Sequence, residues 1–100
     1  MVLSAELRFH IPGAHSLKEK RKVRRSLIDG ARHRFNAAIA EVDTQDAHQL
    51  LTIGAAVVSG SLPHAREMLD AVIRYLEENA EAQLMGVERF IANEVRERSV

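Results

Sequence analysis

The chain has 100 residues, of which 46% are hydrophobic and 28% charged, and it contains no cysteine. This composition is typical of one globular domain, and it excludes a disordered chain, a disulfide framework and a thiolate metal site. The formal net charge is zero, but residues 16–35 carry eight Lys or Arg and two acids, whereas the other eighty residues carry six basic and twelve acidic side chains. Because no stretch has the roughly 20 apolar residues of a membrane span and the N-terminus does not look like a signal peptide, we expect a cytoplasmic protein.

The first half of the chain predicts a strand, a helix and a second strand. Residues 2–11 alternate apolar and polar side chains, which indicates a strand with one buried face, and Pro12-Gly13 ends it. Ser16 and Glu19 form a capping box, in which we expect the Glu19 carboxylate to reach back to the Ser16 amide, so a helix follows to about residue 35. Residues 37–43 predict a short strand, and 44–46 a polar turn.

The second half predicts a strand, a helix and a strand. Residues 50–59 are apolar or small at both parities, which indicates a central strand that is covered on both faces. A helix over about 63–79, with Ser61 or Leu62 at its cap, has one apolar stripe at helical spacing: Ala65, Met68, Leu69, Val72, Ile73 and Leu76. Residues 82–91 predict the last strand, and 95–100 are expected to fray.

The order βαββαβ predicts an α+β, ferredoxin-like split β-α-β fold, with two helices on one face of a four-stranded antiparallel sheet. We expect residues 1–100 to form a single domain, ordered over about 2–91, with the first and third strands central. Leu69, Val72 and Ile73 should pack on Leu7, Phe9 and the third strand. Because the helices of this fold cover one face only, a homodimer is expected to shield the other face of the third strand, and the chain after Ile91 is the alternative cover.

Three ordered motifs carry a family resemblance. They are the segment 15–21 (HSLKEKR), residues 35–36 leading into 40–46 (AEVDTQD), and 53–59 (IGAAVVS). Together they resemble the YlxP-like family of small bacterial proteins, a domain without an assigned function, over about residues 3–91. The sequence departs from that family around 46–48, where members often carry a bulky aromatic residue.

The resemblance implies a ferredoxin-like fold and a bacterial origin. Genes of the family often lie among genes for translation initiation and ribosome maturation, which implies a role with RNA. No catalytic residue is carried over, because none is established for the family.

The first helix supplies the main candidate site. Five cations lie within about a third of its circumference, opposite the apolar arc: Lys18, Arg21, Lys22, Arg25 and Arg32. Such a stripe suits contacts with the phosphates of RNA, and a solvated face is the alternative interpretation. Lys20 and Arg24 fall instead within the apolar arc near its N-terminal end, so either the first turn of the helix extends beyond the core or their stems lie along it.

The loop before this helix is a second candidate. His15, Ser16 and Lys18 lie at the positive end of the helix, where free amides can hold a phosphate or sulfate. A plain structural turn is the alternative interpretation.

Other chemistry has little support in the sequence. The segment 41–48 offers carboxylates and a histidine but lacks the spacing of a calcium loop, so no metal site or cofactor is predicted. No serine lies in a motif that links it to a base, and the third strand lacks the aromatic residues with which RNA-recognition motifs stack bases. The leading hypothesis is therefore a non-enzymatic accessory protein that associates with RNA or the ribosome. The alternative is a regulatory domain that binds a small ligand or anion at the loop and the open face of the sheet.

Overall fold

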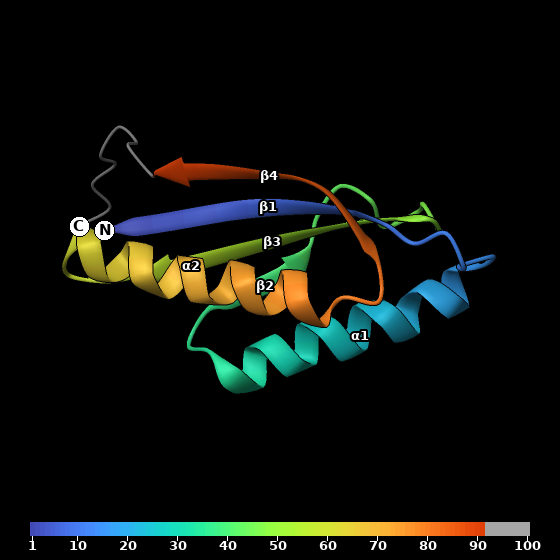
Figure 1. Cartoon of the computed structure of the whole chain (residues 1–100), viewed down its shortest axis with the longest axis horizontal. Coiled ribbons are helices and arrows are strands. Elements are labelled where there is room, and N and C mark those ends of the chain that lie inside the picture. The colour runs from blue at the N-terminus through green and yellow to red at the C-terminus, as the bar shows by residue number, and fades with distance from the viewer. Residues whose placement is uncertain (92–100) are drawn as a thin grey trace, which may run out of the picture.

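The computed structural model describes residues 1–91, and the predicted fraying of 95–100 lies outside them. Six elements follow in the expected order (Figure 1): β1 (Val2–His10), α1 (Leu17–Arg34), β2 (Ala38–Glu41), β3 (Leu50–Val58), α2 (Leu62–Asn79) and β4 (Gln83–Ile91). Their bounds agree with the sequence patterns to within about two residues at each end.

The four strands form one antiparallel sheet in the order β2-β3-β1-β4. β1 and β3 are central, and in their register Leu7 pairs with Ile53. Both helices lie on the same side of the sheet (Figure 1). The predicted ferredoxin-like α+β fold is therefore confirmed.

The N-cap of α1 differs in one detail from the expected capping box. The Ser16 hydroxyl accepts a hydrogen bond from the Glu19 amide at 3.2 Å, as predicted. The Glu19 carboxylate, however, accepts from the His15 amide at 2.6 Å rather than from that of Ser16. The carboxylate is thus held against the loop that precedes the helix, where the partial positive charge of the helix start stabilises it.

A glycine of α1 leaves room for a tyrosine side chain of α2. A Cβ at Gly30 of α1 would collide with the Tyr75 hydroxyl of α2. The Tyr75 ring packs edge-on against Phe35, with the ring centres 5.6 Å apart. Gly30, which weakens an isolated helix by about 1 kcal/mol relative to Ala, therefore leaves space against α1 for the Tyr75 side chain.

The core lies between the helices and one face of the sheet. The residues of α2 predicted to be buried, Leu69, Val72 and Ile73, belong to the same cluster as Leu7 and Phe9. Among the described residues, the opposite face of the sheet has no such cover, since Val58 is 69% and Leu50 42% exposed at the ends of β3. The expectation that β3 is covered on both faces is thus wrong for the single chain, because both helices pack on one side.

Truncation of Leu69 tests this core. Leu69 is fully buried, so Leu69→Ala removes apolar contacts and leaves a cavity, which should lower the free energy of unfolding by about 2–5 kcal/mol. Urea denaturation followed by circular dichroism measures this value. Arg66→Ala, an exposed position on the same helix, is the control and should change it by less than about 0.5 kcal/mol. Equal losses in the two variants would contradict the register of α2.

Candidate functional site

The cations of α1 divide between two faces of the helix. Lys18, Arg21, Lys22 and Arg25 are all exposed, and we call these four residues the outer basic face. Lys20 and Arg24 instead turn toward the sheet, where the Lys20 side chain is only 1% exposed. The sequence predicted the first group, and the structure decides the role of the second.

The outer basic face has no partner within residues 1–91. None of its four side chains makes a hydrogen bond or an ion pair to another described side chain or backbone group. Lys18, Lys22 and Arg25 follow one another over seven residues, or about 10 Å of helix. This part of the helix can therefore offer its full positive charge to an external anion.

Arg32, the fifth predicted cation, is exposed but engaged. Its Nε and Nη2 donate to the Ile39 carbonyl at 3.0 and 2.6 Å, so the guanidinium ties the last turns of α1 to the edge strand β2. A role in anchoring the helix therefore accounts for this residue, and the outer basic face does not depend on it.

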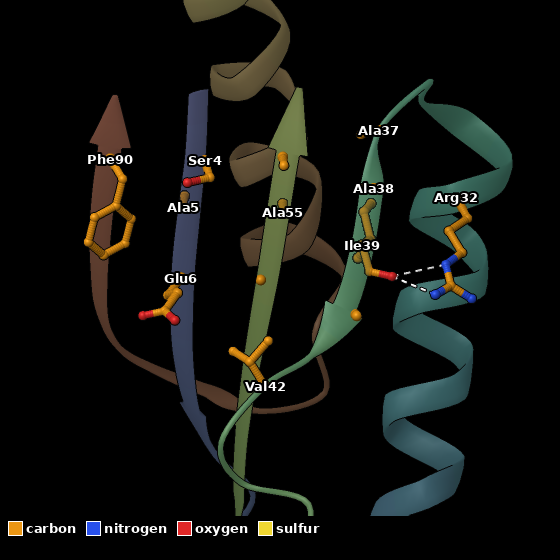
Figure 2. A pocket seen from close by; sticks show the side chains of 13 residues that line it. Ser4, Ala5, Glu6, Arg32, Ala37, Ala38, Ile39, Val42, Ala55 and Phe90 are labelled. Atoms are coloured by element: carbon orange, nitrogen blue, oxygen red, sulfur yellow. Dashed lines mark hydrogen bonds between the residues drawn. The ribbon is translucent and has the colours of Figure 1, made fainter. Parts of the chain in front are cut away.

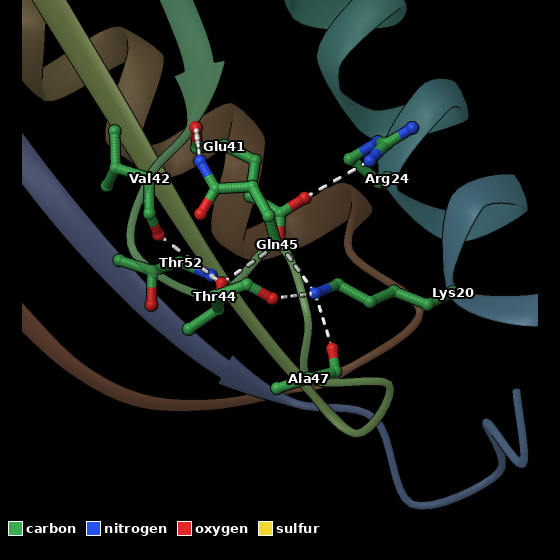
Figure 3. Close-up of polar contacts among 8 residues, drawn as sticks. All are labelled: Lys20, Arg24, Glu41, Val42, Thr44, Gln45, Ala47 and Thr52. Atoms are coloured by element: carbon green, nitrogen blue, oxygen red, sulfur yellow. Dashed lines mark hydrogen bonds and ion pairs between the residues drawn. The ribbon is translucent and has the colours of Figure 1, made fainter. Parts of the chain in front are cut away.

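The inward-facing cations meet at a buried glutamate (Figure 3). The Lys20 ammonium lies 2.6 Å from Glu41 Oε2 and also donates to the carbonyls of Thr44 and Ala47. Arg24 Nη1 lies 3.2 Å from Glu41 Oε1, and the Thr44 hydroxyl donates to Oε2 at 2.9 Å. We call these four residues, Lys20, Arg24, Glu41 and Thr44, the buried charge network. Sequence reasoning missed it, although a lysine in the apolar arc of α1 was the signal that could have indicated it.

The network sets the pKa of Glu41. Burial of the carboxyl, whose side chain is 4% exposed, tends to raise its pKa. Hydrogen bonds from Lys20, Thr44 and Arg24 and the charge of Lys20 outweigh burial, and they hold the pKa below the usual value for glutamate. Glu41 is therefore ionised at neutral pH, and its carboxylate is paired with the Lys20 and Arg24 side chains of α1.

The segment 41–48 is thus a structural turn that binds the Lys20 and Arg24 side chains of α1. Asp43 adopts a positive φ of 61°, and the Thr44 hydroxyl accepts from the Thr52 amide at 2.8 Å. Within residues 1–91, no three His, Asp or Glu side chains gather as a group that could hold a metal ion. The Glu41 carboxylate, the buried acid of this segment, faces cations of the chain itself.

The loop before α1 brings its three predicted anion-binding residues together at the surface. His15, Ser16 and Lys18 are all exposed at the start of the helix. The Glu19 carboxylate already occupies the His15 amide, and it adds a negative charge at the position where an anion would bind. This geometry favours the outer basic face over the loop as a site for anions.

A groove of about 550 Å³ lies on the other side of the sheet, away from the helices. Figure 2 shows it between Phe90 of β4 and Val42 after β2, with Ser4 and Glu6 of β1 in between. Phe90 is the exposed aromatic residue of this face, whereas Phe9 is buried in the core as the sequence predicted.

In the part of the chain that the structure describes, no helix is long and apolar enough to cross a membrane.

Removal of the Lys20 ammonium should be strongly destabilising. Lys20→Met leaves the buried Glu41 carboxylate with fewer cationic partners, so the free energy of unfolding should fall by about 3–5 kcal/mol. The double variant Lys20→Met/Glu41→Leu removes both buried charges and should recover part of this loss. Chemical denaturation of the two variants measures both effects. Stability of Lys20→Met within 0.5 kcal/mol of wild type would contradict a buried ion pair.

The lowered pKa of Glu41 predicts acid sensitivity. Below the usual glutamate pKa of about 4.3 the unfolded chain binds more protons than the folded one, so stability is present above that pH and is lost as the pH falls through the lower folded value. Glu41→Gln, which cannot titrate, should lose less stability between pH 5 and pH 3 than wild type. Urea midpoints across this range measure the slopes, and parallel slopes would count against the network.

Comparison with known proteins adds a family but no activity. Residues 2–89 match the family described as "Protein of unknown function (DUF503)". The "Uncharacterized protein YlxP" of Bacillus subtilis strain 168 is 34% identical over 77 residues, which are 77% of this chain and 84% of the relative. The solution structure of the de novo designed protein LFR1 1, with ferredoxin fold, is similar to this chain with a TM-score of 0.54 and 15% sequence identity. The match covers all of this chain and 92% of the designed protein, and it supports the fold alone. Because the family match and the relative both span most of the chain, this chain belongs to the YlxP-like DUF503 family.

Proposed function

We propose that this protein is a non-enzymatic accessory protein that binds RNA, free or within the ribosome, through the outer basic face of α1. The observation that carries the proposal is the set of four exposed cations, Lys18, Arg21, Lys22 and Arg25, without an ion pair in residues 1–91. A partner with regularly spaced negative charges matches this arrangement, since a nucleic-acid strand presents a phosphate at each nucleotide. Such contacts position a protein on RNA without reading its sequence.

The contrast with the neighbouring cations supports this proposal. Lys20, Arg24 and Arg32 are held by Glu41 and the Ile39 carbonyl, so their positive charge has a structural role. The outer basic face has no such explanation within the described chain. Its rigid helical scaffold also limits the backbone conformational freedom that would be lost on binding.

A regulatory domain that binds a small anion at His15, Ser16 and Lys18 is the alternative. It has less support, because Glu19 places its carboxylate on the His15 amide. Inorganic phosphate distinguishes the two functions. It should displace RNA only through ionic strength if the helix face binds RNA, but it should saturate at one site per chain if the loop is an anion site.

The salt dependence of binding tests the proposed function. Fluorescence anisotropy with a labelled single-stranded RNA should show affinity that falls steeply with salt, with a log–log slope of about −3 for four phosphate contacts. The charge reversal Lys22→Glu/Arg25→Glu should abolish measurable binding. The thermal midpoint should change little, because exposed charges contribute little to stability, apart from a small like-charge effect between position 25 and Asp29, one turn on.

A matched control separates a site from diffuse attraction. Arg66→Glu/Arg74→Glu reverses two exposed arginines on α2, whose residues 63–79 carry two basic and four acidic side chains. This variant should retain most of the affinity. Equal weakening by both double variants would show attraction without a site, and no binding by the wild type at low salt would overturn the proposal.

A further inference from the structure

The face of the sheet opposite the helices carries apolar side chains that adjoin one another. Val2 and Val58 are paired in the register of β1 and β3 and are 40% and 69% exposed. Two residues further along β1, Phe90 lies beside Ser4 and is 43% exposed. Scattered apolar residues are ordinary on a protein surface, but a contiguous set on one face indicates a surface that binds another protein chain.

This face has two halves of different height. The β2–β3 half is low where Ala38 pairs with Ala56 and Ala40 pairs with Gly54. The β1–β4 half is high, because Glu6, Arg8, Glu88 and Phe90 stand on it. The step between the two halves is the groove of about 550 Å³, and Figure 2 shows the Phe90 ring on one side of it and Ala38 on the other.

The two halves are complementary to each other under a twofold rotation. The axis lies between the two stacked sheets, parallel to the strands and level with the gap between β1 and β3. A rotation by 180° about it places β4 of one copy over β2 of the other, and β1 over β3. Residues that share a row of the register then face each other, so Phe90 stands over Ala38 of the second copy and Val2 over its Val58. Large side chains thereby meet small ones in the two rows that hold Phe90 and Glu88, which face Ala38 and Ala40 of the second copy, as a self-complementary twofold interface requires.

The charges of this face follow the same symmetry. Glu6 lies opposite Glu88, and Arg8 pairs with Glu88 at 2.8 Å, which leaves Glu6 without a cation among residues 1–91 and the β1–β4 half with an excess of acid. Arg32 lines the opposite rim of the groove, beside β2. The rotation brings this arginine of the second copy to the outer side of β4, toward Glu88, and places Glu6 of one copy next to Glu6 of the other.

The area is close to what a dimer needs when the whole face takes part. The strands β1, β3 and β4 have nine residues and are about 30 Å long, whereas β2 has four, and four strands span roughly 14–19 Å, so each copy offers roughly 400–500 Å² in projection. Two copies then bury roughly 800–1,000 Å², close to the lower limit for a specific interface. Two sheets packed in this way lie about 10 Å apart with nearly aligned strands.

We propose that this protein forms a homodimer through its open sheet face, with the twofold axis parallel to the strands. A second copy is the occupant that the height of the two halves fits, with an area close to the lower limit for a specific interface. The proposal is independent of RNA binding, because the outer basic face lies on α1 and has no residue in the groove.

A chemical crosslink tests both the dimer and its orientation. The chain has no cysteine, so Ala40→Cys/Glu88→Cys introduces the only two thiols, on strands separated by roughly 14 Å within one chain. A bismaleimide shorter than this separation cannot join them within the chain, but it should join Cys at position 40 of one copy to Cys at position 88 of the other. Denaturing electrophoresis should show a product of twice the 11.2 kDa of the chain. The single variants Ala40→Cys and Glu88→Cys, whose thiols lie on opposite halves of the dimer, should give little of it.

Sedimentation equilibrium tests the dimer without a crosslink. The wild type should dimerise with concentration, and Ala56→Arg, which fills the groove, should be a monomer with an unchanged circular dichroism spectrum. Glu77→Arg, on the exposed side of α2, should still dimerise. A wild type that stays monomeric up to millimolar concentration would overturn the proposal, as would crosslinking of the single variants as efficient as that of the pair. So would a chain that dimerises only after removal of residues 92–100, because that segment would then be the cover of the face.

Discussion

The ion pair between Lys20 and Glu41 is the contact on which the arrangement of α1 depends. It joins the buried side of α1, near the start of the helix, to the end of the edge strand β2. Both side chains are almost fully shielded from water. A buried charge without its partner costs several kcal/mol, so rotations of α1 that separate these two groups are strongly disfavoured. The rotation that keeps them together also turns Lys18, Lys22 and Arg25 away from the protein.

The network is satisfied in detail, which explains how a lysine can be buried here. An ammonium group has three donors, and Lys20 directs them to Glu41 and to the carbonyls of Thr44 and Ala47. Among the residues that the structure describes, no buried side-chain nitrogen or oxygen lacks a hydrogen-bond partner. An apolar pair of similar volume could be equally stable. What the ion pair adds is one defined orientation of the helix, and with it one defined position of the outer basic face.

The two proposed surfaces lie on different layers of the molecule. The outer basic face belongs to the helical layer, whereas the groove lies on the far side of the sheet (Figures 1 and 2). A dimer through the sheet would carry one basic face on each copy and leave both accessible. Two linked faces raise the effective concentration of the second contact, so a long RNA that reaches both would bind more tightly than a short one.

The sequence by itself determined the elements and the topology of this protein. The alternation in residues 2–11, the stripe from Ala65 to Leu76 and the Ser16 and Ser61 caps are local signals, and local hydrogen bonds and side-chain periodicity suffice to interpret them. The outer basic face was predictable for the same reason, since exposed cations follow from helical geometry alone.

Only the tertiary structure decided what the remaining cations do and which sheet face stays open. Lys20 meets Thr44 and Ala47, which are 24 and 27 residues away, and no periodicity within α1 contains that information. Similarly, the pattern of β3 is apolar on both faces, but the pattern does not say that α1 and α2 pack on the same side. That choice depends on the handedness of the chain connections and on the packing of the helices, and it leaves Val58 and Leu50 exposed on the face where a second copy is proposed to bind.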